Sequence, residues 1–294
     1  MDWQDRLITL FLFISKSYEE ELCVTAERLS NNATPDFSDA EVLTVYLWGI
    51  MVGQRKITMI HQYTRDHLSS WFPKLPAYAT FIQRLNRLSG VFEPLLTHIQ
   101  KKFPLFKDGE FIRLIDSMPI MIAKAQRSGS SKVASELANK GYNSTKKTYY
   151  YGVKLHILGL RRAQQLPLPD YIGLTPASEA DINVLKEISE DLYDTPIYAD
   201  KAYIDELLRE VLKQQGCALL TPIKKKKGEK HLLLFDQAHS TLVSQMRQPI
   251  ESLFGWIEEK TGIQVASKVR STQGLLVHVF GKLAAAMLML VAGF

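Results

Sequence analysis

The segment Phe111–Ile120, with the sequence FIRLIDSMPI, places one acidic residue inside a nearly continuous apolar run. Such a run predicts a strand that is buried on both faces of a mixed or parallel sheet. An ionised carboxylate in that strand is costly unless it is paired, hydrogen-bonded or bound to a metal. Asp116 is therefore either a structural residue with a buried partner or one member of a site to which other acids contribute.

A second acid, Asp200, ends the short apolar run that begins at Thr195. A helical pattern starts soon afterwards, near Tyr203, so we expect Asp200 at the carboxyl end of a strand. In open α/β sheets, ligand-binding groups collect at that end.

A third acid, Glu251, follows Pro249, and proline is typical of the first turn of a helix. We therefore expect a helix that begins near Pro249, with Glu251 close to its start. Ile250, Phe254 and Ile257 fall at helical spacing, so Glu251 borders the buried stripe of this helix. Arg247 lies four residues earlier and could neutralise Glu251 or a phosphate.

The three acids lie in the motifs Ile-Asp-Ser-x-Pro (115–119), Tyr-Ala-Asp-Lys-Ala-Tyr (198–203) and Arg-x-x-x-Glu (247–251). In this order the motifs resemble the DDE-type transposases of bacterial insertion sequences, and among these the nine-eight-two insertion-sequence group most closely. The segments 38–44, 75–78, 84–87 and 150–156 are also similar to that group, so the resemblance covers nearly the whole chain.

The resemblance implies that Asp116, Asp200 and Glu251 are catalytic residues and metal ligands, with Asp116 bridging two Mg²⁺ ions that Mn²⁺ can replace. Two such ions stabilise the attacking and leaving oxygens of phosphodiester cleavage. The implied reaction is hydrolysis at the ends of the element, followed by attack of the freed 3′ hydroxyl on target DNA. A Glu251 carboxyl more than about a dozen ångströms from the other two would refute this arrangement.

The expected fold is α/β (α+β). The patterns predict three strands, a helix, a strand, a helix, a strand and a late helix, which is the layout of a ribonuclease-H-like core with a mixed five-stranded sheet flanked by helices. No strand is evident before Phe111. We therefore expect an all-helical domain at residues 1–105 and the catalytic domain at residues 106–294.

The helix predicted at about Ala79–Leu88 carries Arg84 and Arg87 on a polar face. Short helices before it suit a helix-turn-helix-like domain that binds DNA ends through these arginines. A helical bundle whose polar face is merely solvated is the alternative.

A net charge of +5 and a pI near 9.0 agree with a polyanionic partner but do not establish one. Beyond the two arginines, the candidate DNA contacts are basic residues near the predicted site: Arg127, Lys146, Lys147, Lys154, His156, Lys224, Lys225, Lys226, Lys227 and Arg247. His156 could also lie near the metals. The alternative for these residues is a solvated loop or a cleft edge.

The two cysteines, Cys23 and Cys217, lie in unrelated contexts, which is typical of the reducing cytoplasm. The apolar segments 7–14 and 275–294 are interpreted as an amphipathic helix and a buried closing helix, so no membrane association is expected. The expected partners are the terminal inverted repeats, target DNA and a second copy of the chain in a dimer on DNA.

Three other functions compete with the transposase. A metal-dependent nuclease would share the three acids, and a catalytically silent derivative would bind DNA without needing them. A glycosidase would use two carboxylates, but it needs an aromatic sugar cleft and leaves the basic loops without a role.

Overall fold

The structure is a computed structural model that describes residues 2–26, 35–102, 111–144, 146–225 and 232–291. The chain divides into two compact units. The first, here called the helical unit, contains Met1–Phe103 together with Ile257–Phe294, and the second, the sheet unit, is Pro104–Trp256. These units differ from the expected division at residue 105 because residues 257–294 group with the N-terminal helices.

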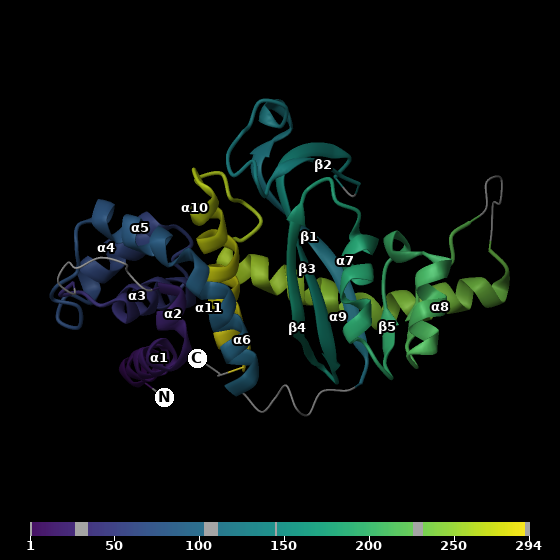
Figure 1. The fold of residues 1–294 in the computed structure, drawn as a ribbon, viewed down its shortest axis with the longest axis horizontal. Helices are drawn as coiled ribbons and strands as arrows, with labels where there is room; N and C mark the ends of the chain where they lie inside the picture. The colour runs from purple at the N-terminus through teal and green to yellow at the C-terminus, as the bar shows by residue number, and fades with distance from the viewer. Residues whose placement is uncertain (1, 27–34, 103–110, 145, 226–231, 292–294) are drawn as a thin grey trace. The chain divides into compact units, whose positions relative to one another are not determined.

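The helical unit contains α1 (Trp3–Ser17), α2 (Cys23–Ala26), α3 (Asp39–Met51), α4 (Ile57–His67), α5 (Tyr78–Arg87), α6 (Phe92–Lys102), α10 (Thr272–Leu276) and α11 (Lys282–Val291). Figure 1 labels these elements. The central helix is α3, and its residues from Val42 to Ile50 are all buried. Helices that are apolar on every side are found in the middle of a core. A capping box of Ser38 and Glu41 begins this helix.

The C-terminal helices complete the core around α3. The hydroxyl of Tyr46 on α3 donates to the carbonyl of Val277 at 3.0 Å, and a side chain at Gly281 would lie 2.6 Å from the Tyr46 ring. The buried Lys282 donates to the carbonyl of Gly262 at 3.1 Å. Thr272–Val291 is long and apolar enough to cross a membrane, but 72% of this stretch is buried in the structure, as in a core helix.

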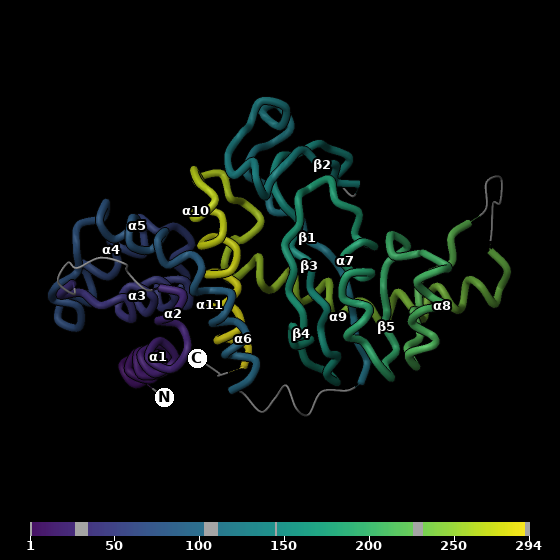
Figure 2. Tube along the Cα trace, viewed as in Figure 1, coloured from purple at the N-terminus to yellow at the C-terminus, as the bar shows by residue number. Residues whose placement is uncertain are grey.

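The sheet unit contains β1 (Arg113–Lys124), β2 (Asn139–Asn143), β3 (Thr148–Arg162), β4 (Gln165–Pro176), α7 (Asp181–Ile188), β5 (Pro196–Tyr198), α8 (Glu206–Gln214), β6 (Ala218–Leu220) and most of α9 (Leu234–Thr261). The trace in Figure 2 follows the chain through the hairpin of β3 and β4. Apolar runs of alternating or continuous burial form the long strands, as the sequence predicts.

The sheet is mixed and has the strand order β2-β3-β1-β5-β6. Strand β1 is antiparallel to β3 and parallel to β5, which is in turn parallel to β6. Strand β4 also pairs with β3. Because β2 pairs with residues 148–152 of β3 and β4 with residues 153–162, these two strands follow one another along the same edge of β3.

The two faces of the sheet are covered by different helices (Figure 1). Ile115 and Leu158 form a buried cluster with Leu185 of α7 and Leu208 of α8. On the opposite face, a side chain at Gly159 would meet Ile250 of α9 at 3.3 Å. The register then assigns each residue of β1 and β3 to the α7 face or to the α9 face.

Two sequence-based expectations are wrong here. The sheet has six strands instead of five, because residues 139–143 form the edge strand β2, which the patterns do not predict. The helix that carries Glu251 begins at Leu234, so Pro249 lies inside it and not in its first turn. A proline within a helix removes one backbone hydrogen bond, but the 28-residue helix continues across it.

Candidate active site

The first two acids lie on neighbouring strands at the same level of the sheet. Leu114 of β1 is opposite Tyr198 of β5 in a parallel pair. Asp116 and Asp200 each lie two residues further along, so the register brings them side by side. Both carboxylates accept a backbone N–H from the following residue, Ser117 at 2.8 Å and Lys201 at 2.5 Å. These bonds fix the carboxyl groups at the point where the short strand β5 ends.

The third acid approaches from α9, on the face that Asp116 shares. Arg247 of α9 donates from one guanidinium nitrogen to Oδ2 of Asp116 at 3.0 Å, and its other terminal nitrogen lies 3.7 Å from Oε1 of Glu251. One guanidinium therefore contacts both carboxylates. This geometry agrees with the expectation that the carboxyl groups of Glu251 and Asp116 lie near one another.

Exposure differs sharply within this group. The side chain of Arg247 is 8% exposed and that of Asp116 is 21% exposed, whereas Glu251 is 60% exposed. Burial raises the pKa of Asp116 to about 6, and repulsion from Asp200 and Glu251 acts in the same direction. Arg247 and the N–H of Ser117 oppose this rise. The carboxyl group is thus held in an environment that disfavours its own charge unless a further cation is present.

The donor set fits a hard divalent cation, since all three groups are carboxylates. As arranged here, however, no three His, Cys, Asp or Glu side chains of the described residues are gathered closely enough to hold a metal ion. The physical reason is visible in the contacts: the guanidinium of Arg247 lies between Asp116 and Glu251. Arg247 contributes the positive charge at the place where a cation would share these two ligands.

Sequence reasoning missed one polar group beside the acids. Tyr203 is fully buried, and its hydroxyl has no hydrogen-bond partner among the described residues. Burial raises the pKa of Tyr203 well above its ordinary value, and the charges of Asp181, Asp116 and Asp200 act in the same direction. The only sequence signal was its place in the Tyr-Ala-Asp-Lys-Ala-Tyr motif, where the aromatic residue looked like part of a helix.

His156 and Lys154 lie on the other face of the sheet. His156 is opposite Ser117 in the antiparallel pair, and Asp116 is opposite Ile157, so their side chains point to opposite faces. His156 is fully buried and its Nε2 lies 2.8 Å from the hydroxyl of Thr175. Burial lowers its pKa to about 4, which makes it neutral near pH 7. The side chain of His156 therefore points away from the face of the sheet that carries Asp116, and its contact with metal or DNA stays a prediction.

Lys154 is already bound within the protein. Its ammonium group donates to the carboxylate of Asp181 at 2.9 Å and to the carbonyl of Glu179 at 2.7 Å. These bonds join β3 to the start of α7, where Asp181 is the first helical residue. These bonds give Lys154 a structural role, and its contact with DNA stays a prediction.

The remaining basic candidates of the sheet unit are on its surface. Arg127, Lys146, Lys147, Lys224 and Lys225 are exposed. Lys226 and Lys227 lie outside the described residues. Exposed lysines and arginines are typical phosphate contacts, but exposure does not distinguish this role from simple solvation.

The two arginines of the helical unit are not free on a polar face. Arg84 donates to Oδ1 of Asp39 at 2.6 Å, and Arg87 pairs with Oδ2 of the same carboxylate. Arg84 is only 8% exposed and both arginines are paired, so the alternative of a merely solvated polar face does not describe them, and their contact with DNA ends stays a prediction. Both arginines reach inward from α5 toward the first residue of α3.

A family model described as Transposase DDE domain matches residues 107–271, which is more than half of the chain. The match spans β1, β5 and α9 and thus all three acids. No curated protein and no solved structure matches the chain. By this match, and in agreement with the acids that the sheet and α9 bring together, the chain belongs to the family of transposase DDE domains.

Proposed function

We propose that this transposase hydrolyses the ends of an insertion sequence of the nine-eight-two group and joins the freed 3′ hydroxyl to target DNA. The single observation that carries the proposal is the convergence of Asp116 with Asp200 by register and with Glu251 through Arg247. The protein would act in the cytoplasm as a dimer on DNA.

The sheet supports the assignment to the ribonuclease-H-like fold. Without the short edge strand β2, the order is β4-β3-β1-β5-β6, with two antiparallel pairs followed by two parallel pairs. The first acid lies on the central strand β1 and the second follows the parallel neighbour β5. This placement matches the order of elements expected for that core.

Each acid has a stated role in the proposal. Asp116, which is far less exposed than Glu251, would bridge two Mg²⁺ ions, and Asp200 and Glu251 would each hold one. Bound in this way, the ions would stabilise the negative charge that develops on the attacking and leaving oxygens. The exposure of Glu251 leaves its carboxylate able to turn toward the other two.

When metal ions bind, Arg247 would exchange its carboxylate partners for a phosphate of the DNA. Its guanidinium now contacts two carboxylates, and divalent cations would compete for the same oxygens. A displaced guanidinium has the planar, bidentate geometry that binds a phosphate well. Arg247 is therefore the DNA contact that we assign nearest to the reacting bond, while Arg127, Lys146, Lys147, Lys224 and Lys225 would contact the backbone further away.

The test is Mg²⁺-dependent joining of a labelled duplex, carrying the terminal repeat of the element, to supercoiled plasmid. Asp116→Asn, Asp200→Asn and Glu251→Gln should each abolish joining and leave duplex binding intact. Asp194→Asn is the matched control, because this residue has φ of 46° and asparagine adopts that conformation readily. Joining by any of the three variants would remove that residue from the site.

The same assay separates the second candidate, a metal-dependent nuclease of the same fold. A nuclease would nick or cut the labelled duplex but give no joined product, and the three variants would lose that cleavage. A silent DNA-binding derivative would bind the duplex and show neither reaction in any form.

A further inference from the structure

Tyr203 is a buried residue of the sheet unit to which the proposed reaction assigns no role. Its ring belongs to the apolar cluster that also contains Ile115, Leu185 and Ala199. Its hydroxyl is enclosed and has no hydrogen-bond partner among the described residues. A buried hydroxyl without an acceptor is costly, so such groups are rare and call for an explanation.

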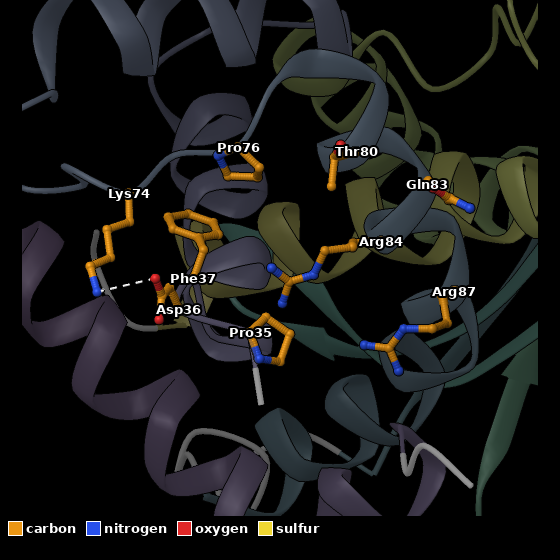
Figure 3. Close-up of a pocket in the computed structure, with 9 residues that line it drawn as sticks. All are labelled: Pro35, Asp36, Phe37, Lys74, Pro76, Thr80, Gln83, Arg84 and Arg87. Atoms are coloured by element: carbon orange, nitrogen blue, oxygen red, sulfur yellow. Dashed lines mark ion pairs between the residues drawn. The ribbon is translucent and has the colours of Figure 1, made fainter. Parts of the chain in front are cut away.

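The missing partner distinguishes Tyr203 from most enclosed polar groups of the protein. Arg84, which lines the pocket of the helical unit in Figure 3, also has an enclosed nitrogen without a partner among the described residues. Another nitrogen of Arg84 donates to Asp39, however, so that side chain is partly satisfied. The phenol of Tyr203 has a single polar group, and none of its hydrogen-bonding capacity is used. Among the described side chains with a single polar group, Trp48 and Tyr150 share this state.

The backbone connects Tyr203 directly to the second acid. Asp200 is the N-cap of the short 3₁₀ helix Lys201–Tyr203, and the N–H of Tyr203 donates to the carbonyl of Asp200 at 3.0 Å. Asp200 itself follows the end of β5. The tyrosine and the acid are thus parts of one hydrogen-bonded turn at the carboxyl end of this strand.

Electrostatic interactions extend from the acids of the site to this hydroxyl. Burial raises the pKa of Tyr203 well above its ordinary value. The charges of Asp181, Asp116 and Asp200 raise it further, so the phenol stays protonated and able to donate. The pKa of Tyr150 is also raised by burial, but the only charge that acts on it is that of Asp181. The two catalytic aspartates therefore act on one of these tyrosines and not on the other.

Asp200 is the aspartate of the site that is open to a further donor. Both oxygens of Asp116 are occupied, one by the N–H of Ser117 and the other by Arg247. The carboxylate of Asp200 accepts the N–H of Lys201 and has no ion-pair partner among the described residues. One of its oxygens can therefore accept another bond.

Asp181 is the alternative acceptor, because its charge also acts on the hydroxyl. This carboxylate is already neutralised by Lys154, whose ammonium group donates to it at 2.9 Å. Asp181 acts on Tyr150 as well, and the hydroxyl of Tyr150 has no partner among the described residues. The influence of Asp181 thus does not distinguish Tyr203, and the open carboxylate of Asp200 remains.

We propose that Tyr203 is a positioning residue of the metal site, whose hydroxyl donates to the carboxylate of Asp200 once a divalent cation is bound. One oxygen of Asp200 binds the cation, and the other accepts the bond from Tyr203. Without the cation the carboxylate is turned toward the N–H of Lys201, which leaves the tyrosine unpaired. Because donor and acceptor belong to the same turn, no molecule has to enter the enclosed space.

The inference rests on the proposed function, since it requires the metal site that the three acids would form. Donors behind a metal ligand fix its orientation, and removing such a donor weakens metal binding. The expected effect of the tyrosine hydroxyl is therefore on the affinity for the cation. A hydroxyl that only stabilised the fold would affect thermal unfolding instead.

The test is Tyr203→Phe, which removes the hydroxyl oxygen and keeps the packed ring. Tyr150→Phe is the matched control, because it removes an equally enclosed hydroxyl without a described partner from the same unit. The full chain is used for every variant. Thermal unfolding is followed by circular dichroism in EDTA, and Mn²⁺ binding is measured by titration calorimetry.

In EDTA neither phenylalanine variant should have a lower unfolding midpoint than the unchanged protein, because each loses a hydroxyl that makes no bond to a described residue. Tyr203→Phe should bind Mn²⁺ about ten-fold more weakly than the unchanged protein, whereas Tyr150→Phe should bind it with the same affinity. A lower midpoint in EDTA for Tyr203→Phe alone would overturn the inference, because the hydroxyl would then have a partner before the metal binds.

Equal Mn²⁺ affinities of Tyr203→Phe and the unchanged protein would also overturn it, as would equal losses in the two phenylalanine variants. Asp200→Asn is measured in parallel to separate this inference from the proposed function. If Asp200→Asn loses Mn²⁺ affinity and Tyr203→Phe does not, the metal site is supported and the positioning role is refuted. If the unchanged protein binds no Mn²⁺, the proposed metal site is refuted together with the role of Tyr203.

Discussion

Replacing Asp116 with asparagine should stabilise the folded protein near neutral pH. The folded protein raises the pKa of this carboxyl from 3.8 to about 6, mainly through burial. The charged form is therefore less favourable in the folded chain than in the unfolded chain. Asparagine keeps an oxygen that can accept the N–H of Ser117 and carries no charge.

The magnitude follows from the two pKa values. At 1.36 kcal/mol for each pKa unit, the interval from 3.8 to about 6 corresponds to ~3 kcal/mol. A group whose folded pKa is raised contributes stability that is complete below 3.8 and is lost as the pH rises through about 6. The free energy of unfolding of Asp116→Asn should thus equal that of the unchanged protein near pH 4 and exceed it by ~3 kcal/mol near pH 7.5.

The assay is thermal unfolding in EDTA at both pH values. For a unit of this size, ~3 kcal/mol corresponds to a rise of about 6–12 °C in the midpoint. Asp39→Asn is the control, for which the opposite effect is expected. The arginines lower the pKa of Asp39, so its charge stabilises the folded protein above pH 3.8, and the asparagine variant should have a lower unfolding midpoint near pH 7.5. A lower midpoint for Asp116→Asn at pH 7.5, or a difference independent of pH, would refute the reasoning.

Two further predictions concern α9 and the sheet. Arg247→Gln removes the guanidinium that competes for the two carboxylates, so Mn²⁺ measured by titration calorimetry should bind about ten-fold more tightly, and unchanged or weaker binding would contradict this. Gly152→Ala should lower the free energy of unfolding by ~3 kcal/mol in denaturant titrations, because its Cβ would lie 2.0 Å from the carbonyl oxygen of Ile120. Gly129→Ala should have little effect, because no atom of the described residues lies within 4 Å of the added Cβ. Equal losses of unfolding free energy in the two alanine variants would count against this explanation.

The acids of the sheet could be located from sequence because local patterns define buried strands. The apolar run that contains Asp116 and the run that ends at Asp200 mark β1 and β5, and the parallel register of these strands brings the two residues together. The pairing of Arg247 with Glu251 could also be predicted, because the two residues are four positions apart and four residues make about one helical turn.

The features that were missed depend on distant contacts. Residues 139–143 are not predicted as a strand because lysine, glycine and asparagine are poor strand formers, but these residues pair with the edge of β3. Pro249 was predicted to begin a helix because no local sequence signal shows that the residues before it already form part of the same helix. His156 and Asp116 point to opposite faces of the sheet. This follows only from the strand register, which cannot be deduced from the sequence alone.

The bond from Tyr46 to Val277 spans 231 positions of the chain, and it has a practical consequence for dissecting the protein. A fragment that ends near residue 103 would lack α10 and α11, so apolar surface of α3 would be left uncovered. Removing the last thirty or so residues from the intact chain would, by the same reasoning, damage the helices at its beginning before it damaged the sheet. Deletions at either end should therefore be interpreted as changes to one and the same folded body.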